Sequence, residues 1–276
     1  MDRESGRVER HYGRGGILAS IVAALKASDK DVARLAPQDL APVDEFHLRG
    51  REATLQLAQR AALRPGLRVL DVGCGLGGSA RHLAAEHGGH VTGVDLTREY
   101  IDAARDRAER VGLQERVSFF TCSALSLPFP ADAFDLVWTE HAQMNIADKP
   151  RFYGEIVRVL SPTGRLVFHD IFQGAAGPPH FPVPWAEEPS LSALAPPDVV
   201  RGIVERLGMR VLEWEDVTVP SREWVHAMLD KLAQSGPPPL GLHLLMGDTA
   251  RHKLQNMARS FEENRIQVVQ AVAMKG

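Results

Sequence analysis

Short apolar runs recur along the middle of the chain, and each is followed by a polar or glycine-rich turn. The runs lie at residues 68–72, 90–95, 116–121 and 133–138. Apolar runs of this length, bounded by turn signals, predict buried strands. The segment 100–111 between two of them has the apolar spacing of a helix. Alternation of such strands and helices predicts an α/β fold with a mostly parallel sheet.

The rest of the chain predicts three more strands. A helix end, a turn and a fifth strand follow one another over residues 156–170, and the alternating segments 209–218 and 266–274 have the pattern of terminal strands. We expect seven strands in all. Between the last two strands the sequence predicts a helix at 224–233, a break at the prolines 237–239 and a long helix at 248–264.

The turn after the first predicted strand is rich in glycine. Gly73, Gly75 and Gly78 follow the apolar run, and Asp71 stands two residues before the first of them. Glycines let the backbone turn tightly and approach a ligand closely, and open α/β sheets bind ligands at the carboxyl ends of their strands. The segment therefore predicts a nucleotide-type cofactor site. By itself the glycine pattern also fits an NAD(P)-dependent reductase.

A second acidic residue, Asp95, ends the next apolar run. It follows the glycine turn by about 20 residues, which is the spacing expected of a ribose ligand. We expect its carboxylate to accept hydrogen bonds from both ribose hydroxyls. The alternative is that Asp95 caps the helix predicted at 100–111, because Asp is favoured at helix N-termini.

The segment Val69-Leu-Asp-Val-Gly-Cys-Gly75 resembles the first motif of class I S-adenosylmethionine-dependent methyltransferases. The resemblance extends over roughly residues 68–170. It implies a Rossmann-like doubly wound seven-stranded sheet with an antiparallel last strand, and S-adenosyl-L-methionine as cofactor. In this family the acid at the position of Asp71 lies near the methionine ammonium. A carboxylate suits that cation, whereas a dinucleotide pyrophosphate is better held by amides at a helix N-terminus.

The resemblance also implies where the rest of the cofactor lies. Ser123 stands where the family usually has an acid, and its hydroxyl accepts a hydrogen bond more weakly than a carboxylate. Tyr12 is placed to close on the methionine end of the cofactor, although it also suits the packing of a terminal helix. The cofactor-binding residues predicted in this way are Tyr12, Asp71, Gly73, Gly75, Asp95, Leu96, Ser123, Ala124, Leu125 and His141.

Residues outside this core are expected to enclose the acceptor. We predict an N-terminal helical lid at residues 1–60, with helices at 17–26 and 50–63, and a methyltransferase domain at 61–276 with cap insertions near 172–200 and 220–264. Trp185 lies in a proline- and glycine-rich part of the first insertion, where it either forms an apolar or cation-holding wall or fills a gap in the core. The predicted substrate residues are His47, His180 and Trp185.

Chemistry is expected where the fourth strand ends. Methyl transfer from a sulfonium is an in-line displacement that depends mainly on alignment. A base is required only if the acceptor must lose a proton. His141, Gln143 and Asn145 are the predicted catalytic residues, with His141 as the base because an imidazole titrates near neutral pH. The alternative for His141 is a cofactor contact through its backbone alone.

The identity of the acceptor is open. The segments 143–149 and 182–185 resemble a bacterial group related to sarcosine and dimethylglycine N-methyltransferases, which implies N-methylation of a glycine-type amine. Arg49 and Arg51 are available as a clamp for its carboxylate. O- or C-methylation of a natural product, quinone or terpenoid-type acceptor is the near alternative. A protein that binds S-adenosylmethionine without methylating is a further one, because fold does not imply function.

Composition narrows the class of partner. The 276-residue chain has 32 Lys and Arg against 35 Asp and Glu, a net charge of -3, and no basic run, so a nucleic acid partner is not expected. Its two cysteines are interpreted as reduced thiols, and no ligand spacing predicts a metal. The polar N-terminus and the absence of a long apolar run predict a cytoplasmic protein without a membrane span. The oligomeric state is open, a homodimer included.

Overall fold

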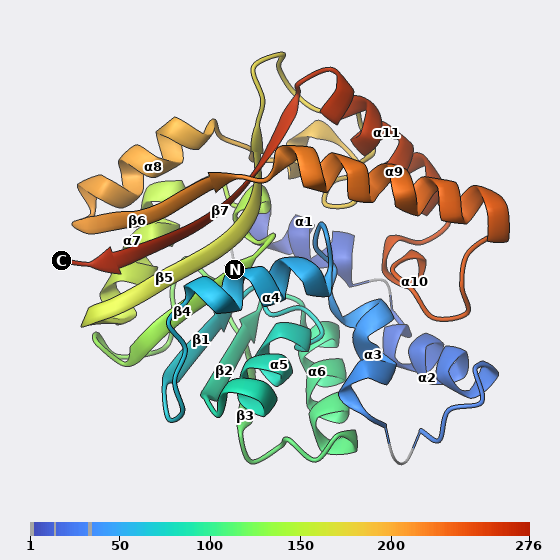
Figure 1. Ribbon diagram of the computed structural model, residues 1–276, viewed down its shortest axis with the longest axis horizontal. Coiled ribbons are helices and arrows are strands. Elements are labelled where there is room, and N and C mark those ends of the chain that lie inside the picture. Colours follow the sequence, from blue (N-terminus) through green and yellow to red (C-terminus); the bar gives the residue numbers. More distant parts are fainter. Residues whose placement is uncertain (1–2, 14, 33–34) are drawn as a thin grey trace.

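A seven-stranded sheet forms the centre of the computed structural model, which describes residues 3–13, 15–32 and 35–276 (Figure 1). The strand order is β3-β2-β1-β4-β5-β7-β6. Only β7 runs antiparallel to its neighbours, β5 and β6. The predicted doubly wound sheet with an antiparallel last strand is therefore confirmed. The strands are β1 Arg68–Val72, β2 His90–Asp95, β3 Val117–Thr121, β4 Phe134–Glu140, β5 Leu160–Gln173, β6 Met209–Asp216 and β7 Ile266–Lys275.

Helices cover both faces of the sheet, which explains why the central strands are apolar on both sides. In β1, Val69 packs in one hydrophobic cluster, whereas Leu70 and Val72 pack in another on the opposite face. A strand buried on both faces reads as a continuous apolar run rather than an alternating one. The first face is covered by α4 Arg51–Arg60, α5 Gly78–His87 and α6 Arg98–Arg110, and the second by α7 Lys149–Val159 and α8 Pro197–Arg206.

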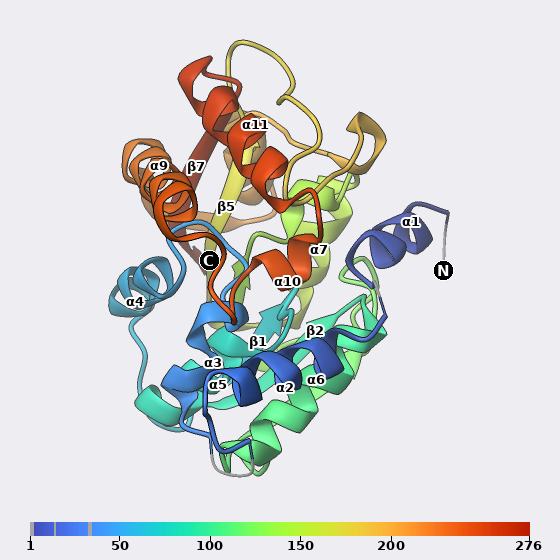
Figure 2. The same cartoon turned by 90° about the vertical axis from the view of Figure 1, so that its right-hand side faces the viewer.

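Additional helices surround the carboxyl ends of the strands. In the N-terminal part of the chain, α2 contacts α6 and α3 contacts α5, while in the C-terminal part α9 and α11 lie side by side (Figures 1 and 2). None of the helices in the described ranges is long and apolar enough to cross a membrane. These elements are α1 Arg3–Tyr12, α2 Ile17–Ala27, α3 Pro37–Asp44, α9 Thr218–Ser235, α10 His243–Met246 and α11 Ala250–Glu262.

Several boundaries differ from the sequence prediction. The segment 37–49, for which the sequence predicted no helix, contains α3, whose first turn accommodates proline because the missing N–H would be unpaired there. Helix α9 begins six positions before the expected residue 224, at Thr218. The turn expected near residues 161–164 lies within β5 as an irregularity, since the pairing with β4 jumps from Phe134–Leu160 to Leu136–Arg165. The division into lid and domain stays a prediction.

Two glycines fix the turn between β1 and α5. Gly73 has a φ of 77°, and a Cβ built on it lies 2.6 Å from the Cβ of Ala142. Gly77 has a φ of 78°, and its Cβ would lie 2.6 Å from the ring of Phe119. Left-handed backbone and close packing both require glycine at these positions. The turn therefore brings the loop after β4 against the end of β1.

Candidate functional site

A cavity of about 170 Å³ lies at the carboxyl ends of β1, β2 and β4. The N-terminal segment closes it on one side through Tyr12, Phe46 and His47. We call it the first cavity. Every residue predicted to bind the cofactor lines it: Tyr12, Asp71, Gly73, Gly75, Asp95, Leu96, Ser123, Ala124, Leu125 and His141. The structure brings these residues together, while their individual roles stay predictions.

Asp71 presents an unpaired carboxylate oxygen to this cavity. Its side chain is only 2% exposed, and Oδ2 has no hydrogen-bond partner among the described residues. Burial is the main cause that raises the pKa of Asp71 well above its usual value, followed by the nearby carboxylates Glu140 and Asp95. A backbone hydrogen bond from Ala80 stabilises the charge in part, but a buried carboxylate oxygen without a hydrogen bond is still costly. The site is therefore suited to a cation that pairs with Asp71.

Asp95 is held in place by two backbone N–H groups. Gly75 N–H donates to Oδ2 at 3.0 Å and Thr97 N–H donates to Oδ1 at 2.8 Å. The N-cap of α6 is Thr97 rather than Asp95. Asp95 is therefore not the cap of this helix, although it accepts a hydrogen bond from the N–H of its cap residue. The side chain of Thr97 and the backbone of Leu96 also stabilise this carboxylate, which lines the cavity. At the far end of the cavity, the Ser123 hydroxyl oxygen accepts from Leu125 N–H at 3.2 Å.

Asp170 on β5 holds the loop after β4 in place through two hydrogen bonds. Its Oδ2 accepts hydrogen bonds from the N–H groups of Ala142 and Gln143, both at 3.0 Å. Gln143 turns inward: its amide donates to the carbonyl of Ile171 at 3.3 Å, and it is 1% exposed and outside the cavity linings. The structure thus does not bring the Gln143 side chain to the site. Sequence reasoning missed Asp170, which shapes this loop.

Asn145 connects the N-terminal segment to the first cap insertion. Its Oδ1 accepts from the Tyr12 hydroxyl at 2.8 Å, and its Nδ2 donates to the carbonyls of Trp185 at 2.8 Å and Leu191 at 2.9 Å. The carboxamide is fully engaged by these bonds. Asn145 lines the first cavity, but its contacts favour a role in holding the N-terminal segment against residues 185–191.

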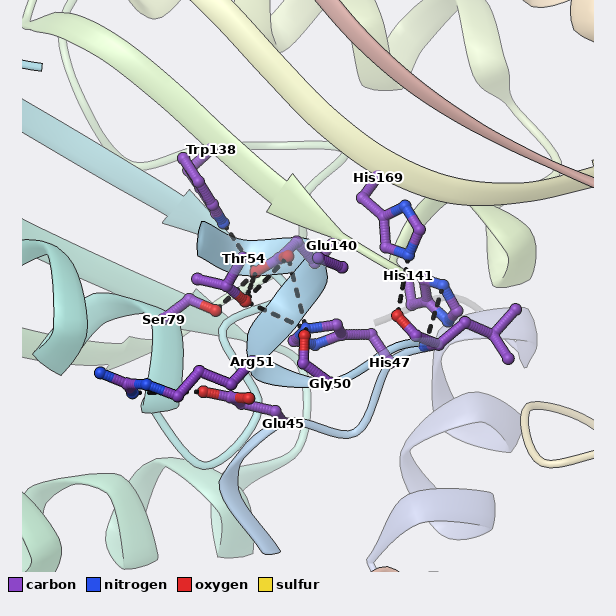
Figure 3. Close-up of polar contacts among 12 residues, drawn as sticks. Glu45, His47, Gly50, Arg51, Thr54, Ser79, Trp138, Glu140, His141 and His169 are labelled. Atoms are coloured by element: carbon purple, nitrogen blue, oxygen red, sulfur yellow. Dashed lines mark hydrogen bonds and ion pairs between the residues drawn. The ribbon is translucent and has the colours of Figure 1, made fainter. Parts of the chain in front are cut away.

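Glu140, the last residue of β4, is the centre of a buried polar network (Figure 3). It accepts hydrogen bonds from Trp138 Nε1 at 2.9 Å, Ser79 Oγ at 2.5 Å and Thr54 Oγ1 at 3.1 Å, and His47 Nε2 lies 3.4 Å from its Oε1. Such donors stabilise an ionised carboxylate. Sequence reasoning did not select Glu140, although an acid that ends a buried strand was an available signal.

Three histidines meet beside this network, around the backbone of Leu48 (Figure 3). Leu48 N–H donates to His141 Nε2 at 3.4 Å, and His169 Nε2 donates to the Leu48 carbonyl at 3.0 Å. The ring centroids of His47 and His141 lie 6.0 Å apart. Burial lowers the pKa of His141 well below its usual value, as do His169 and His47, and burial lowers the pKa of His169 to about 3. Both rings are therefore neutral near pH 7.

A second, smaller cavity of about 30 Å³ adjoins the first at His47 and His141. The first cap insertion contributes Trp185 to its wall, and the C-terminal helices contribute Trp224 and Met257. The indole of Trp185 is 1% exposed and donates to Ser192 Oγ at 3.0 Å. It thus lines the cavity and also fills the core, so both predicted interpretations describe part of its environment.

Other predicted substrate residues lie away from both cavities. His180 pairs with Glu263 at 2.8 Å near the end of α11. Arg49 donates to Glu52 at 2.6 Å, and Arg51 faces Glu45 at 3.6 Å. Neither arginine lines a cavity. The expected clamp for a substrate carboxylate is not formed by them.

The residues of the first cavity fit S-adenosylmethionine. The unpaired oxygen of Asp71 suits the methionine ammonium, and the Asp95 carboxylate, fixed at the cavity wall by backbone N–H groups, suits ribose hydroxyls. A Cβ added to Gly75 would meet nothing within 4 Å, so the backbone there is open to a ligand. The N–H groups that hold Asp95 belong to the loops after β1 and β2. These loops lie at the carboxyl ends of the strands, where such sheets bind nucleotides.

Comparisons with known proteins agree with this interpretation. Residues 70–168 match the family model of the methyltransferase domain. The chain is 38% identical over 133 residues to the methyltransferase GfsG of Streptomyces halstedii, a match that covers 48% of each chain. It is 29% identical over 177 residues to the glycine/sarcosine/dimethylglycine N-methyltransferase of Actinopolyspora halophila, covering 64% of this chain and 31% of that one. The chain thus spans half or less of these relatives.

A solved structure has the same fold. Phosphoethanolamine N-methyltransferase 2 of Haemonchus contortus, in complex with phosphomonomethylethanolamine and S-adenosylhomocysteine, superposes with a TM-score of 0.76. The match covers 97% of this chain and 60% of that chain at 20% sequence identity. At this identity the similarity concerns the fold.

Proposed function

We propose that this chain, of which residues 70–168 match the family model of the methyltransferase domain, transfers a methyl group from S-adenosylmethionine to a small-molecule acceptor. The observation that carries the proposal is the unpaired, buried oxygen of Asp71 in a cavity that also contains Asp95. Bound there, the sulfonium supplies an activated methyl group. The second cavity begins at His47 and His141, on the wall of the first, so it offers the acceptor a place beside that group.

The protein contributes alignment and exclusion of water. Asp71 would hold the ammonium group of the methionine part and Asp95 the ribose hydroxyls. Residues 122–125 border the region for the adenine. Tyr12 closes the cavity by its bond to Asn145. In-line displacement gains most of its acceleration from such positioning. The similar proteins include N-methyltransferases. The acceptor assay identifies which atom of the acceptor this protein methylates.

A reductase that uses NAD(P)H is the alternative from another class. Asp71 disfavours it, because a buried carboxylate beside the glycine turn opposes an anionic pyrophosphate. Calorimetry with S-adenosylmethionine, S-adenosylhomocysteine and NADH separates the two. We expect binding of the first two ligands and none of NADH. Tight binding of NADH without S-adenosylhomocysteine binding would contradict the proposal.

Turnover separates a methyltransferase from a protein that only binds the cofactor. Release of S-adenosylhomocysteine is measured with sarcosine, 2-naphthylamine and 2-naphthol as acceptors of different chemistry, each at saturating S-adenosylmethionine. Mass spectrometry of the product identifies the methylated atom. Cofactor binding without product from any acceptor in a wider panel would favour a non-methylating protein.

A further inference from the structure

The tautomer of His47 is determined by its surroundings. Its Nε2 lies 3.0 Å from the carbonyl oxygen of Gly50. A carbonyl only accepts, so Nε2 carries the hydrogen, and in a neutral imidazole the lone pair is then on Nδ1. Among the described residues, no hydrogen bond to Nδ1 is formed, and the contacts of the ring are made through Nε2. His47 lines both cavities.

His141 has the opposite tautomer. Its Nε2 accepts the N–H of Leu48 at 3.4 Å, so the hydrogen of the neutral ring is on Nδ1. The lone pair that a base requires is therefore already directed at a backbone donor. Burial and the neighbouring His169 and His47 also oppose protonation of this ring. His141 is arranged to donate a hydrogen bond rather than to take a proton.

The carboxylate of Glu140 lies next to His47 and compensates the positive charge of its protonated ring. Oε1 lies 3.4 Å from His47 Nε2, and the other contacts of the carboxylate come from Trp138, Ser79 and Thr54 (Figure 3). A carboxylate that orients an imidazole and stabilises its protonated form is the arrangement of an activated base. The network thus supports a proton on Nδ1 once one arrives.

The walls of the second cavity indicate the chemistry of the acceptor. Apart from the two histidines and Tyr12, its lining is apolar and aromatic, and no arginine or lysine of the described residues lines either cavity. The carboxylate of a glycine-type amine would lack a cation there and would lie near Glu140, and burying such a charge unpaired is costly. An apolar body bearing one protic group fits this surface better.

We propose that the acceptor is an apolar molecule with a hydroxyl group, and that His47 is the base that removes the hydroxyl proton. This inference rests on the proposed function. The O–H bond breaks and its proton moves to the lone pair of Nδ1. The oxygen forms a bond to the donated methyl carbon, and the sulfur–methyl bond breaks with its electron pair kept by sulfur. The titratable groups that face His47 during this step are Glu140, His141 and His169.

Nitrogen NMR of the histidine-labelled parental protein tests the tautomers without any variant or substrate. We expect His47 as the Nε2–H tautomer and His141 as the Nδ1–H tautomer at pH 7.5, with assignment through side-chain connectivity. His47 with its hydrogen on Nδ1 would overturn the assignment of the base. This readout is independent of cofactor binding, so it can fail while the proposed function stands.

Binding of 2-naphthol to the complex with S-adenosylhomocysteine tests the acceptor class and the base together. We expect 2-naphthol to bind and sarcosine not to bind. The bound naphthol should also ionise at lower pH in the parental protein than in His47→Gln, as read from the naphtholate absorption. His226→Gln, an exposed histidine paired with Glu262, is the matched control and should behave as the parent. Preferred binding of sarcosine would overturn the acceptor class.

Turnover completes the test with the acceptor found in the panel. His47→Gln should lower kcat by about 100-fold or more, the range of general-base contributions, and leave the affinity for S-adenosylmethionine unchanged. The rise of kcat with pH should disappear in the variant. An unchanged kcat would overturn the role of His47 alone, whereas a parental protein that does not bind S-adenosylmethionine would overturn the proposed function.

Discussion

Asp71 illustrates how a single residue is destabilising in the free protein and useful in the complex. Its buried Oδ2 lacks a partner, and burial raises its pKa. Because the folded-state pKa lies above the value of the unfolded chain, the ionised group costs stability as pH rises through this window. A cation that pairs with the carboxylate removes the cost. Stability and ligand binding are therefore linked at this position.

Asp71→Asn separates the two effects. The amide keeps the shape and loses the charge, so the free variant should be at least as stable as the parent at pH 7.5. Its affinity for S-adenosylhomocysteine should fall by about 1.5 to 3 kcal/mol, the usual value of a hydrogen bond to a charged group. Calorimetry measures the affinity and urea unfolding the stability. Asp102→Asn, which changes an exposed carboxylate, serves as control, and equal affinity of Asp71→Asn and parent would remove Asp71 from the ammonium site.

Glu45 gives a pH-dependent prediction. Burial, followed by the charge of Glu140, raises the pKa of Glu45 to about 8, whereas an unfolded glutamate titrates near about 4.3. The stability from this group is fully present below the unfolded value and is lost as pH rises through about 8. Glu45→Gln mimics the protonated form, so it should lose less stability between pH 5 and 9.

The measurement is the free energy of unfolding in urea at pH 5, 7 and 9. At pH 9 the variant should gain on the order of 1 to 3 kcal/mol relative to the parent, after the loss of the Arg51 contact is included. Glu205→Gln, in an exposed pair with Arg201, should show no such trend. Parallel pH profiles of Glu45→Gln and parent would mean that Glu45 is not buried as described.

Among single residues, the sequence predicted those that belong to a local motif. Asp71 is the last but one residue of β1 and Asp95 is the last residue of β2, and their neighbours in the chain define the site. Glu140 was not predicted as a functional residue, because its partners Ser79 and Thr54 come from helices distant in the sequence. Which nitrogen of His47 is protonated depends on Gly50 and was equally outside the reach of residue patterns.

Among the elements, α3 is anchored by a buried cluster of charges. Asp44, at its end, lies 2.5 Å from Arg81 on α5 and 3.7 Å from Arg107 on α6. Burial lowers the pKa of Arg107 to about 10. Apolar contacts of α2 and α3 with α6 add to this attachment. The N-terminal segment is thus fixed to the core at α3.

Asp44→Asn should be strongly destabilising. Removing one partner leaves two guanidinium groups buried beside each other, which typically costs about 3 to 5 kcal/mol. Asp102→Asn removes an exposed carboxylate beside Arg98 and Arg105 and should cost less than about 1 kcal/mol. Urea unfolding of both variants compares them. Similar losses in the two would contradict the importance of burial for the α3 anchor.

The elements themselves were predictable where a strong pattern recurs. All seven strands were predicted, because the central strands, buried on both faces, give apolar runs and the two terminal strands give alternating ones. Helices α1 and α3 were not, since α1 is polar (RESGRVERHY) and α3 contains Pro37 and Pro42. Their positions depend on tertiary contacts, such as the Asp44 cluster, which local propensity does not encode.

Across the molecule, the two cavities share the wall formed by Tyr12, Phe46, His47, His141 and Met144. Tyr12 bonds Asn145, and Asn145 bonds the backbone of Trp185 in the first cap insertion. We therefore expect a ligand that contacts Tyr12 in the first cavity to stabilise a wall of the second as well. At about 30 Å³ the second cavity is small for an acceptor such as 2-naphthol, so we expect its walls to move when an acceptor binds.

Binding of the cofactor and of the acceptor should consequently be coupled. We expect S-adenosylhomocysteine to raise the affinity for 2-naphthol by about 5- to 150-fold, the usual range of coupling between sites, and 2-naphthol to raise the affinity for S-adenosylhomocysteine by the same factor. Calorimetry of each ligand with and without the other measures both changes in affinity.

Two variants test the path of the coupling. Tyr12→Phe deletes the hydroxyl that donates a hydrogen bond to Asn145 and should reduce the coupling. Tyr153→Phe deletes a buried hydroxyl that has no partner among the described residues and should leave it intact. Equal affinities for 2-naphthol in the presence and absence of S-adenosylhomocysteine would mean that the shared wall does not connect the sites.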